Sequence, residues 1–381
     1  MKIVIDAYQM APNVTGTDRQ ARNVLRELQL LDTVNEYVVI VSDKHRFVAE
    51  VVAAPNFRLL PLRINRQAAW RLFGLPKIIR RERATVFFSF HNLASPLVKN
   101  SKIVVSALDL IPFVYQQTYY RGFVHRWVRR PLVLGMMKAA TLLGDAFLAN
   151  SQFTKQSVAA RFNIPPEQIE VGDLQAEPIF FDKPGGGRIA AVRAKYRLPD
   201  KYVFCLGGSE PRKNVAAVIK GHQLLPGGLR SGFPLVVGGA KWQDAGLPLA
   251  NDPLVKHIGF VDDVDLPVVY SLAAVFAWPS EYEGFGLPVL EAMASGTPVL
   301  TSNATALPEV VGDAAVLVDP QNPSQIRDGL EKILTDPDFR TALGTRGFAN
   351  VARFSWKQNA AILLSLFTRV CRNAGAGHQR G

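Results

Sequence analysis

Short apolar runs alternate with segments of helical spacing along the chain, which is the pattern of repeated β-α-β units. In the first half, these runs predict buried strands at Lys2–Asp6, Tyr37–Val41, Phe57–Leu62, Val86–Phe90, Ile103–Ala107 and Asp145–Asn150. In the second half, they predict strands at Tyr202–Leu206, Leu235–Val237, Lys256–Ile258, Ala274–Trp278, Thr297–Leu300 and Val316–Val318. Because helical segments connect the strands, we expect an α/β fold with parallel sheets.

A stretch rich in proline and glycine interrupts this alternation near the middle of the chain. It runs from Pro165 to Gly187, and such stretches are typical of boundaries between domains. A chain of 381 residues is also longer than one typical hydrophobic core supports. We therefore predict two domains, residues 1–184 and 185–356, each with its own Rossmann-like sheet.

The composition indicates a globular protein of a reducing compartment. Hydrophobic residues make up 48% of the chain, which excludes a disordered protein. The two cysteines, Cys205 and Cys371, lie far apart in apolar surroundings, which fits a protein without disulfides. The first apolar run is too short for a signal peptide, and no run is long enough to span a bilayer. We expect a cytoplasmic protein.

Basic residues are concentrated in one part of the chain. The formal net charge is +12, and residues 42–140 alone carry seventeen Lys and Arg against four Asp and Glu. Within that segment, Trp70–Arg83 and Tyr115–Lys138 interleave arginines with aromatic and aliphatic side chains. This pattern predicts a basic amphipathic surface on an anionic membrane. The alternatives are a helix packed on the sheet with a solvated basic face, and a nucleic-acid surface. Because the pattern occurs twice, we favour the membrane and expect no nucleic-acid partner.

One loop in the second half carries the strongest chemical signal. The strand ending at Trp278 is followed by a polar loop with two glycines, and Pro288 then opens a helical pattern that closes at Gly296. The N–H groups at the start of such a helix bind anions. Glu283 and Glu291 flank this turn, and a carboxylate beside an anion is repulsive unless it accepts hydrogen bonds from hydroxyls. The loop therefore indicates a ligand with phosphate and sugar parts, and the alternative is an ordinary turn with solvated glutamates.

The spacing Glu283-x7-Glu291 around Gly-Phe-Gly-Leu resembles the donor-site signature of retaining GT-B glycosyltransferases of family 4, group 1, which include mannosyltransferases. The resemblance implies a GT-B fold, in which two Rossmann-like domains with parallel sheets face each other across a central cleft. It also implies that a last helix, residues 357–381, returns to the first domain. It assigns the ribose hydroxyls to Glu291. The resemblance implies that the donor sugar and phosphate are bound by Glu283, Gly284, Phe285, Gly286 and Leu287.

A second glycine loop, Gly207 to Asn214, follows the first predicted strand of the second domain. Glycines allow a close backbone approach, and adjacent cations at Arg212 and Lys213 suit a diphosphate. The loop resembles the family's second donor-site element, in which an Arg and a Lys neutralise the leaving diphosphate. That resemblance places Gly208 beside the donor. The alternative is a solvated basic loop.

The first domain contributes candidates at the carboxyl ends of its strands, where α/β proteins bind ligands. His91 and Asp109 follow two of the buried strands, and Gly16 and Thr17 lie in the loop after the first strand. The resemblance implies that this glycine loop faces the donor phosphates and the acceptor. One departure is Leu108, because many relatives carry a histidine immediately before the aspartate. A leucine cannot hydrogen-bond to a donor sugar.

The resemblance implies a retaining glycosyltransferase, and we predict that its catalytic group consists of Arg212, Lys213, Glu283 and Asp109. The resemblance implies a nucleotide-diphosphate sugar as donor, with GDP-mannose favoured, and a lipid-linked saccharide of bacterial surface polysaccharide as acceptor. Positive groups at the leaving phosphate would stabilise the charge that develops there. We therefore expect no metal and no cofactor, and we interpret the motif Asp263-x-Asp265 as helix capping.

The same features predict a peripheral location on the inner face of the cell membrane. Three alternatives stay open for the function. The first is a glycosyltransferase with a UDP-sugar donor. The second is a catalytically silent GT-B protein that binds a membrane or a protein, which Leu108 motivates. The third is a nucleic-acid-binding protein, which rests on charge alone.

Overall fold

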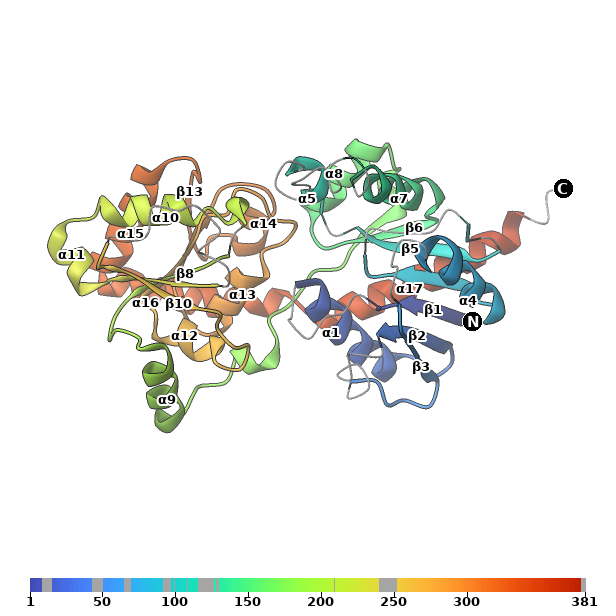
Figure 1. The fold of residues 1–381 in the computed structure, drawn as a ribbon, viewed down its shortest axis with the longest axis horizontal. Coiled ribbons are helices and arrows are strands. Elements are labelled where there is room, and N and C mark those ends of the chain that lie inside the picture. Colours follow the sequence, from blue (N-terminus) through green and yellow to red (C-terminus); the bar gives the residue numbers. More distant parts are fainter. Residues whose placement is uncertain are drawn as a thin grey trace. The chain divides into compact units, whose positions relative to one another are not determined.

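A computed structural model gives the fold of the chain (Figure 1). It describes residues 1–8, 16–42, 51–64, 70–91, 97–98, 100–107, 109–115, 127, 130–208, 210–239 and 252–377. The chain divides into two compact units. Unit 1 is Met1–Leu174 together with Ser355–Gly381, and unit 2 is Gln175–Phe354. Residue 184, where the sequence predicts the boundary, lies within unit 2.

Unit 1 is built on a parallel sheet whose described strands follow the order β3-β2-β1-β4-β5-β6-β7. The strands are β1 (Lys2–Asp6), β2 (Glu36–Ser42), β3 (Phe57–Leu62), β4 (Val86–Ser89), β5 (Lys102–Ala107), β6 (Ala146–Ala149) and β7 (Ile169–Val171). Ile3, Val4 and Ile5 of β1 are fully buried, as expected for a parallel strand that is covered on both faces.

Helices cover this sheet on both faces. They are α1 (Gly16–Leu31), the π-helical turn η1 (Trp70–Gly74), α4 (Leu75–Arg81), α5 (Ile111–Val114), α7 (Arg130–Leu143), α8 (Gln152–Phe162), η3 (Pro166–Gln168) and α17 (Trp356–Gly377). α8 begins at its predicted cap, where Thr154 N donates to Ser151 Oγ at 3.0 Å. α17 packs on α1, and its Asn359 amide donates to the carbonyls of Gly172 and Asp173 at 2.6 and 2.9 Å.

Unit 2 holds a second parallel sheet, in the order β10-β9-β8-β11-β12-β13. Its strands are β8 (Val203–Leu206), β9 (Leu235–Gly238), β10 (Val255–Gly259), β11 (Val275–Trp278), β12 (Val299–Ser302) and β13 (Val316–Val318). Its helices are η4 (Pro178–Phe180), α9 (Gly186–Tyr196), η5 (Pro211–Lys213), α10 (Val215–Gln223), α11 (Gly227–Gly232), α12 (Leu266–Leu272), α13 (Leu287–Ala294), α14 (Leu307–Val311), α15 (Pro323–Thr335), α16 (Pro337–Asn350) and η7 (Val351–Arg353). Val203, Val218, Val275 and Ile326 belong to the core between the sheet and helices α10 and α15.

The α/β class and the parallel sheets are confirmed, and every predicted strand is present with its ends shifted by two residues or fewer. The sequence missed β7, Ile169–Val171. This strand has three residues at the sheet edge and follows a proline pair, so it offers too short an apolar run to recognise. In the part of the chain that the structure describes, no helix is both long and apolar enough to cross a bilayer.

The strand order creates one switch point in each sheet, where neighbouring strands have connections that leave in opposite directions. In unit 1 these neighbours are β1 and β4, and in unit 2 they are β8 and β11. Ligands of open α/β sheets bind outside the carboxyl ends of such strands, because the two following loops diverge there. The fold therefore directs attention to two pairs of loops.

Candidate active site

In unit 2, the loops that follow the switch-point strands β8 and β11 are hydrogen-bonded to each other. Glu281 N and Ser280 Oγ both donate to the Arg212 carbonyl, at 2.7 and 2.9 Å. The Asn214 amide, at the end of the β8 loop, donates to the Pro279 carbonyl at 3.1 Å. The two predicted donor-site elements, which lie about seventy positions apart in sequence, are thus adjacent parts of one site.

Arg212 lies at the centre of this junction. Its Nη1 donates to Glu283 Oε1 at 2.5 Å and to the Tyr282 carbonyl at 3.1 Å, and its Nη2 contacts Glu210 Oε2 at 2.6 Å. The Arg212 side chain is only 11% exposed. Two carboxylates neutralise the charge of this guanidinium. Its contacts with Glu283 and with the Tyr282 carbonyl hold the β11 loop in its observed conformation. The sequence assigns Arg212 to the diphosphate and gives no sign of either ion pair.

Glu283 is 9% exposed, and its two carboxylate oxygens differ in environment. Oε1 accepts from Arg212 and from Ser280 Oγ, the latter at 2.8 Å. Among the described residues, Oε2 has no hydrogen-bond partner, and it is not completely enclosed. The Glu283 backbone N–H donates to Thr305 Oγ1 at 3.1 Å. The carboxylate is therefore held through one oxygen, and the other can accept a hydroxyl of a ligand.

Lys213 keeps most of its charge available. Its side chain is 24% exposed, and its nearest carboxylate in the described residues is Glu210 Oε1, at 4.0 Å. Its stem lies over Gly207, where an added Cβ would stand 3.4 Å from Lys213 Cβ. Burial raises the pKa of the Cys205 thiol at the end of β8, and the Lys213 charge opposes that rise. These contacts place the ammonium group at the carboxyl end of the sheet.

Glycines bring the backbones of three strand ends close together. At Gly239 (φ 134°), a Cβ would lie 1.9 Å from the Gly207 carbonyl oxygen, so no other residue fits there. Gly207 N donates to Gly238 O at 2.9 Å, and Gly239 N donates to Gly259 O at 2.7 Å. Gly208 follows Gly207 and also lacks a side chain. A ligand can therefore approach main-chain atoms without meeting side chains.

The α13 helix begins without a side-chain cap. Its N-cap is Gly286, which has φ 111° and makes no capping hydrogen bond. A Cβ at Gly286 would lie 2.5 Å from Leu307 Cδ2, so glycine is required on both conformational and steric grounds. The first N–H groups of the helix, starting at Leu287, carry the positive end of the helix dipole and can bind an anion.

The remaining residues of the β11 motif divide into core and site positions. The Phe285 side chain is 3% exposed and packs edge-on against Phe354, with ring centroids 5.7 Å apart. It anchors the loop, so only its backbone and that of Gly284 can contact a ligand. Glu291 is 1% exposed on α13. It stands one helical turn after Leu287, and helical side chains lean toward the N-terminus, so its carboxylate is directed to the same end of the helix.

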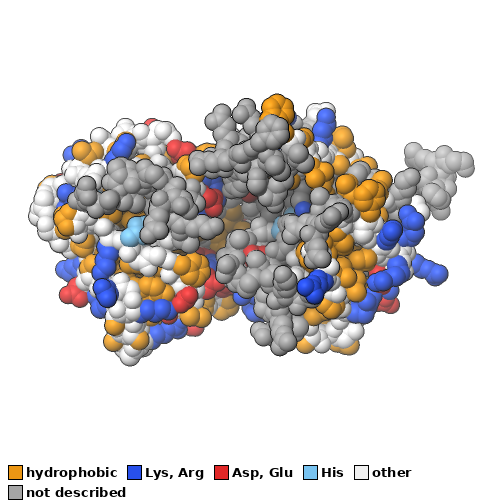
Figure 2. Space-filling view, in the orientation of Figure 1, with side chains coloured by type: hydrophobic (Ala, Val, Ile, Leu, Met, Phe, Trp, Pro, Cys, Tyr) orange, Lys and Arg blue, Asp and Glu red, His pale blue; other side chains and the backbone are white. Residues whose placement is uncertain are grey.

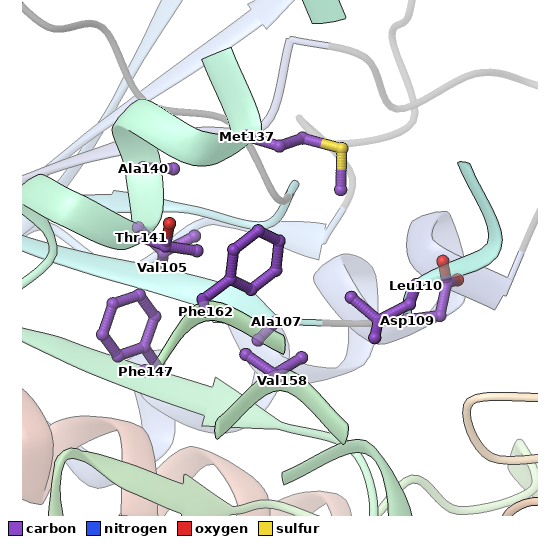
Figure 3. A pocket seen from close by; sticks show the side chains of 10 residues that line it. All are labelled: Val105, Ala107, Asp109, Leu110, Met137, Ala140, Thr141, Phe147, Val158 and Phe162. Atoms are coloured by element: carbon purple, nitrogen blue, oxygen red, sulfur yellow. The ribbon is translucent and has the colours of Figure 1, made fainter. Parts of the chain in front are cut away.

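The predicted residues of the first domain lie in unit 1. Gly16 and Thr17 form the first turn of α1. Asp109 Oδ1 accepts from Ile111 N at 2.9 Å at the start of α5, which is a local turn contact. Asp109 also borders an apolar cavity of about 20 Å³ between β5, α7 and α8, with Met137 and Phe162 in its wall (Figure 3). This cavity is far smaller than the pockets that hold a sugar or a nucleotide, and Leu108 lies outside the described residues.

The interpretation of Trp70–Arg83 as a membrane surface is wrong for Arg71. Its side chain is buried, with 6% exposure, and its charge influences Asp6 and His91. The α-helical spacing of the sequence could not predict the burial of Arg71, because η1 is a π-helical turn. Side chains in such a turn point in other directions than they would in an α-helix. Phe73 of the same turn is 60% exposed. Residues 116–126 and 128–129 of the second basic stretch lie outside the described residues.

The interpretation of Asp263-x-Asp265 as helix capping is confirmed for the position of Asp265 but not for its side-chain contacts. Asp265 is the N-cap of α12 but makes no side-chain capping bond. Its carboxylate binds Lys195 Nζ at 2.6 Å and accepts from Tyr196 Oη at 3.1 Å, while Asp262 binds the same Lys195 at 2.5 Å. These acids join α9 to α12. Among the described residues, no three potential metal-ligating side chains form a cluster, and metal independence stays a prediction.

Two protein-family models match the chain and together span both units. Residues 14–171 match Glycosyltransferase Family 4, and residues 190–350 match Glycosyl transferases group 1. The O-antigen chain mannosyltransferase B of Escherichia coli is 36% identical over 217 residues, which are 55% of this chain and 57% of that protein. The serotype-specific mannosyltransferase WbdA of Escherichia coli is 34% identical over 290 residues, or 72% of this chain and 34% of that protein. The chain thus spans between about a third and just over half of the length of these relatives.

The fold is similar to that of solved glycosyltransferases. The crystal structure of Anabaena HepE in complex with UDP and glucose superposes with a TM-score of 0.73 over 97% of this chain and 99% of that one, at 16% identity. The two parallel sheets follow this architecture, which is the GT-B class. The chain belongs to the family 4, group 1 glycosyltransferases of the GT-B fold.

Proposed function

We propose that this protein transfers a sugar from a nucleotide-diphosphate sugar to a hydroxyl of a saccharide acceptor, with retention of the anomeric configuration. The observation that carries the proposal is the meeting of three groups at the unit 2 switch point. They are the available Lys213 ammonium, the uncapped N-terminus of α13 and the Glu283 carboxylate with one unengaged oxygen. Two positive groups suit a diphosphate, and the carboxylate suits a sugar hydroxyl.

The chemistry that we propose depends on charge at the leaving phosphate. As the glycosidic bond breaks, the sugar gains oxocarbenium character and negative charge grows on the departing diphosphate. Lys213 and the α13 amides are fixed before the reaction, so they stabilise that charge without reorganising. Attack from the same face lets a phosphate oxygen take the acceptor proton. No pair of carboxylates of the hydrolase kind is then required, and Glu283 orients the sugar.

The donor and acceptor that we favour follow the named relatives. Two of these are a mannosyltransferase of O-antigen chains and a serotype-specific mannosyltransferase, which supports GDP-mannose and a lipid-linked surface polysaccharide. A UDP-sugar is the second candidate donor, because the similar fold of HepE was solved with UDP and glucose. Unit 2 binds the donor, and unit 1 receives the acceptor. Gly16 and Thr17, in the first turn of α1, face the donor phosphates and the acceptor in this proposal.

We further propose that unit 1 rests on the inner face of the cell membrane. Large apolar side chains of unit 1 are exposed at Phe73, Val114, Trp127 and Leu142, by 60, 54, 64 and 72%, and Figure 2 shows apolar side chains gathered over α7. Residues 42–140 add a net charge of +13, which favours anionic lipid. Sedimentation with anionic but not with neutral vesicles is the expected result.

The proposed function is tested by measuring binding and transfer together. Calorimetry measures the affinity for GDP, UDP and ADP and for their mannose and glucose conjugates, and the nucleotide sugar that binds most tightly is identified as the donor. Such a ligand binds the folded protein and therefore also stabilises it. Transfer to a lipid-linked saccharide is then followed in the presence of EDTA, and NMR of the product reports the anomeric configuration. Failure of the wild-type protein to bind any of these nucleotides would refute the function, and binding without transfer would favour the silent GT-B alternative.

Glu291→Gln is expected to weaken GDP binding about tenfold or more, because a buried carboxylate that accepts ribose hydroxyls makes charge-assisted hydrogen bonds that an amide cannot replace. The wild-type protein should prefer GDP to 2′-deoxy-GDP, and the variant should bind both nearly equally. Calorimetry with the two nucleotides measures this ratio. An unchanged preference for GDP in the variant would remove Glu291 from the ribose site.

A further inference from the structure

The switch point of unit 1 carries a group of polar side chains that the glycosyl-transfer site does not use, and two of them, Asp6 and Arg71, are buried. Asp6 is the last residue of β1, and His91 follows β4, the neighbouring strand across the switch point. Arg71 approaches both from η1, as its electrostatic effect on each of them indicates. These three side chains therefore occupy the position in unit 1 that the donor loops occupy in unit 2.

Arg71 is a buried cation without a partner in the described structure. Only 6% of the residue is exposed, yet among the described residues it makes no hydrogen bond and no ion pair within 4.0 Å. None of its guanidinium nitrogens is completely enclosed. Removing an arginine from water without pairing it is costly. Such a group is retained where a ligand completes its environment.

The neighbours of Arg71 do not neutralise it. Burial raises the pKa of the Asp6 carboxyl, an effect that the Arg71 charge opposes only in part, so Asp6 ionises less readily than an ordinary aspartate. Burial and the Arg71 charge together lower the pKa of His91 to about 3, so this imidazole is neutral. Its Nε2 is enclosed and has no hydrogen-bond partner in the described residues. His91 therefore carries no charge, and Asp6 forms no ion pair with Arg71 within 4.0 Å in the described structure.

The surrounding contacts hold Arg71 in place before any ligand arrives. Trp70, its neighbour in η1, packs on Tyr8 with ring centroids 5.4 Å apart. Tyr8 N donates to Asp6 Oδ1 at 3.1 Å, and Ile64 N donates to Tyr8 Oη at 3.0 Å. The loop after β1 and the start of η1 are thus tied together. This preorganisation reduces the entropy that binding would otherwise lose.

We propose that Arg71, with Asp6 and His91 around it, binds a phosphate group of the molecule that unit 1 receives, so that the acceptor is a phosphate-bearing saccharide or lipid. A planar guanidinium binds a phosphate through two parallel hydrogen bonds. The identity of the phosphate as an acceptor rests on the proposed function, whereas the anion site itself does not.

The test uses Arg71→Met, which retains bulk and removes the charge, and Arg58→Gln as its control. Arg58 lies in the same unit, pairs with Glu82 at 2.5 Å and is 52% exposed, so the control removes one charge from the same unit without touching the switch point. All variants are built on Lys213→Gln, which removes the proposed diphosphate cation of unit 2. Thermal unfolding is followed with inorganic phosphate, glycerol 3-phosphate and short-chain phosphatidic acid, against sodium chloride of equal ionic strength.

Phosphate should raise the Tm of the Lys213→Gln parent and of the Arg58→Gln variant, but it should not raise the Tm of Arg71→Met. In phosphate-free buffer, the Tm of Arg71→Met should equal or exceed that of the parent. A dissociation constant at least tenfold weaker for Arg71→Met is the expected result. Tighter binding of phosphatidic acid than of glycerol 3-phosphate would identify a phosphate that is carried by a lipid. Tighter binding of glycerol 3-phosphate would identify a phosphate on a water-soluble molecule such as a saccharide. A phosphate shift that persists in Arg71→Met would overturn the proposal, and so would a Tm below that of the control. If the wild-type protein did not bind GDP or the other nucleotides, this result would refute only the proposed transferase function.

Discussion

Replacing Lys213 with glutamine is expected to lower the turnover number by a factor of about a hundred to a thousand, the usual effect of removing one preorganised group from developing oxyanion charge. The reason is that Lys213 lies at the carboxyl end of β8 with its nearest carboxylate in the described residues 4.0 Å away. Arg212, the neighbouring cation, is already paired with Glu283 and Glu210. The diphosphate charge therefore depends chiefly on Lys213 and the α13 amides.

The measurement that isolates this role is the preference of the protein for GDP over GMP. The wild-type protein should bind the diphosphate more tightly, and Lys213→Gln should lose most of this preference, because the variant keeps the α13 amides but lacks the cation at the β-phosphate. Lys220→Gln serves as the control, since Lys220 is exposed on α10 of the same unit. If Lys213→Gln kept both the wild-type GDP preference and the turnover, the assignment of the leaving phosphate to Lys213 would be wrong.

Arg212→Gln should abolish most transfer, by a factor of about a hundred, while GDP affinity changes by less than about threefold, since misplacing a substrate-positioning group has effects of this size. In the structure Arg212 binds carboxylates and the Tyr282 carbonyl. Its loss would release Glu283 Oε1 and the turn that presents Glu283 to the sugar. Arg212→Lys should not restore transfer, because an ammonium cannot reproduce a fork that reaches three acceptors.

Arg230→Gln provides the matched control for the stability change that Arg212→Gln causes. Arg230 is 20% exposed and pairs with Asp252 at 2.6 Å in the same unit. Both variants remove one partner of an ion pair, so both should lower the Tm, by an amount equivalent to about 1–3 kcal/mol. Only Arg212→Gln should lose transfer. A loss of GDP affinity in Arg212→Gln as large as that in Lys213→Gln would instead make Arg212 a phosphate ligand.

The sequence determined the parts of this protein that depend on local patterns. Buried parallel strands give uninterrupted apolar runs, so the alternation of runs and helical spacing was enough to predict the α/β class and the parallel sheets. The glycine turn and Pro288 predicted the start of α13 correctly, because positive φ and a fixed proline φ are local requirements. The strand β7 was missed because three residues at a sheet edge leave almost no pattern.

Which charges are available and which are paired depends on the tertiary structure. Arg212 and Lys213 are adjacent and chemically alike in sequence, yet one is bound to two glutamates and the other is largely unpaired. The basic and apolar neighbours of Arg71 in the sequence predict a surface residue, but the fold buries it. Burial and ion pairing arise from residues that are distant in sequence, and periodicity carries no information about such contacts.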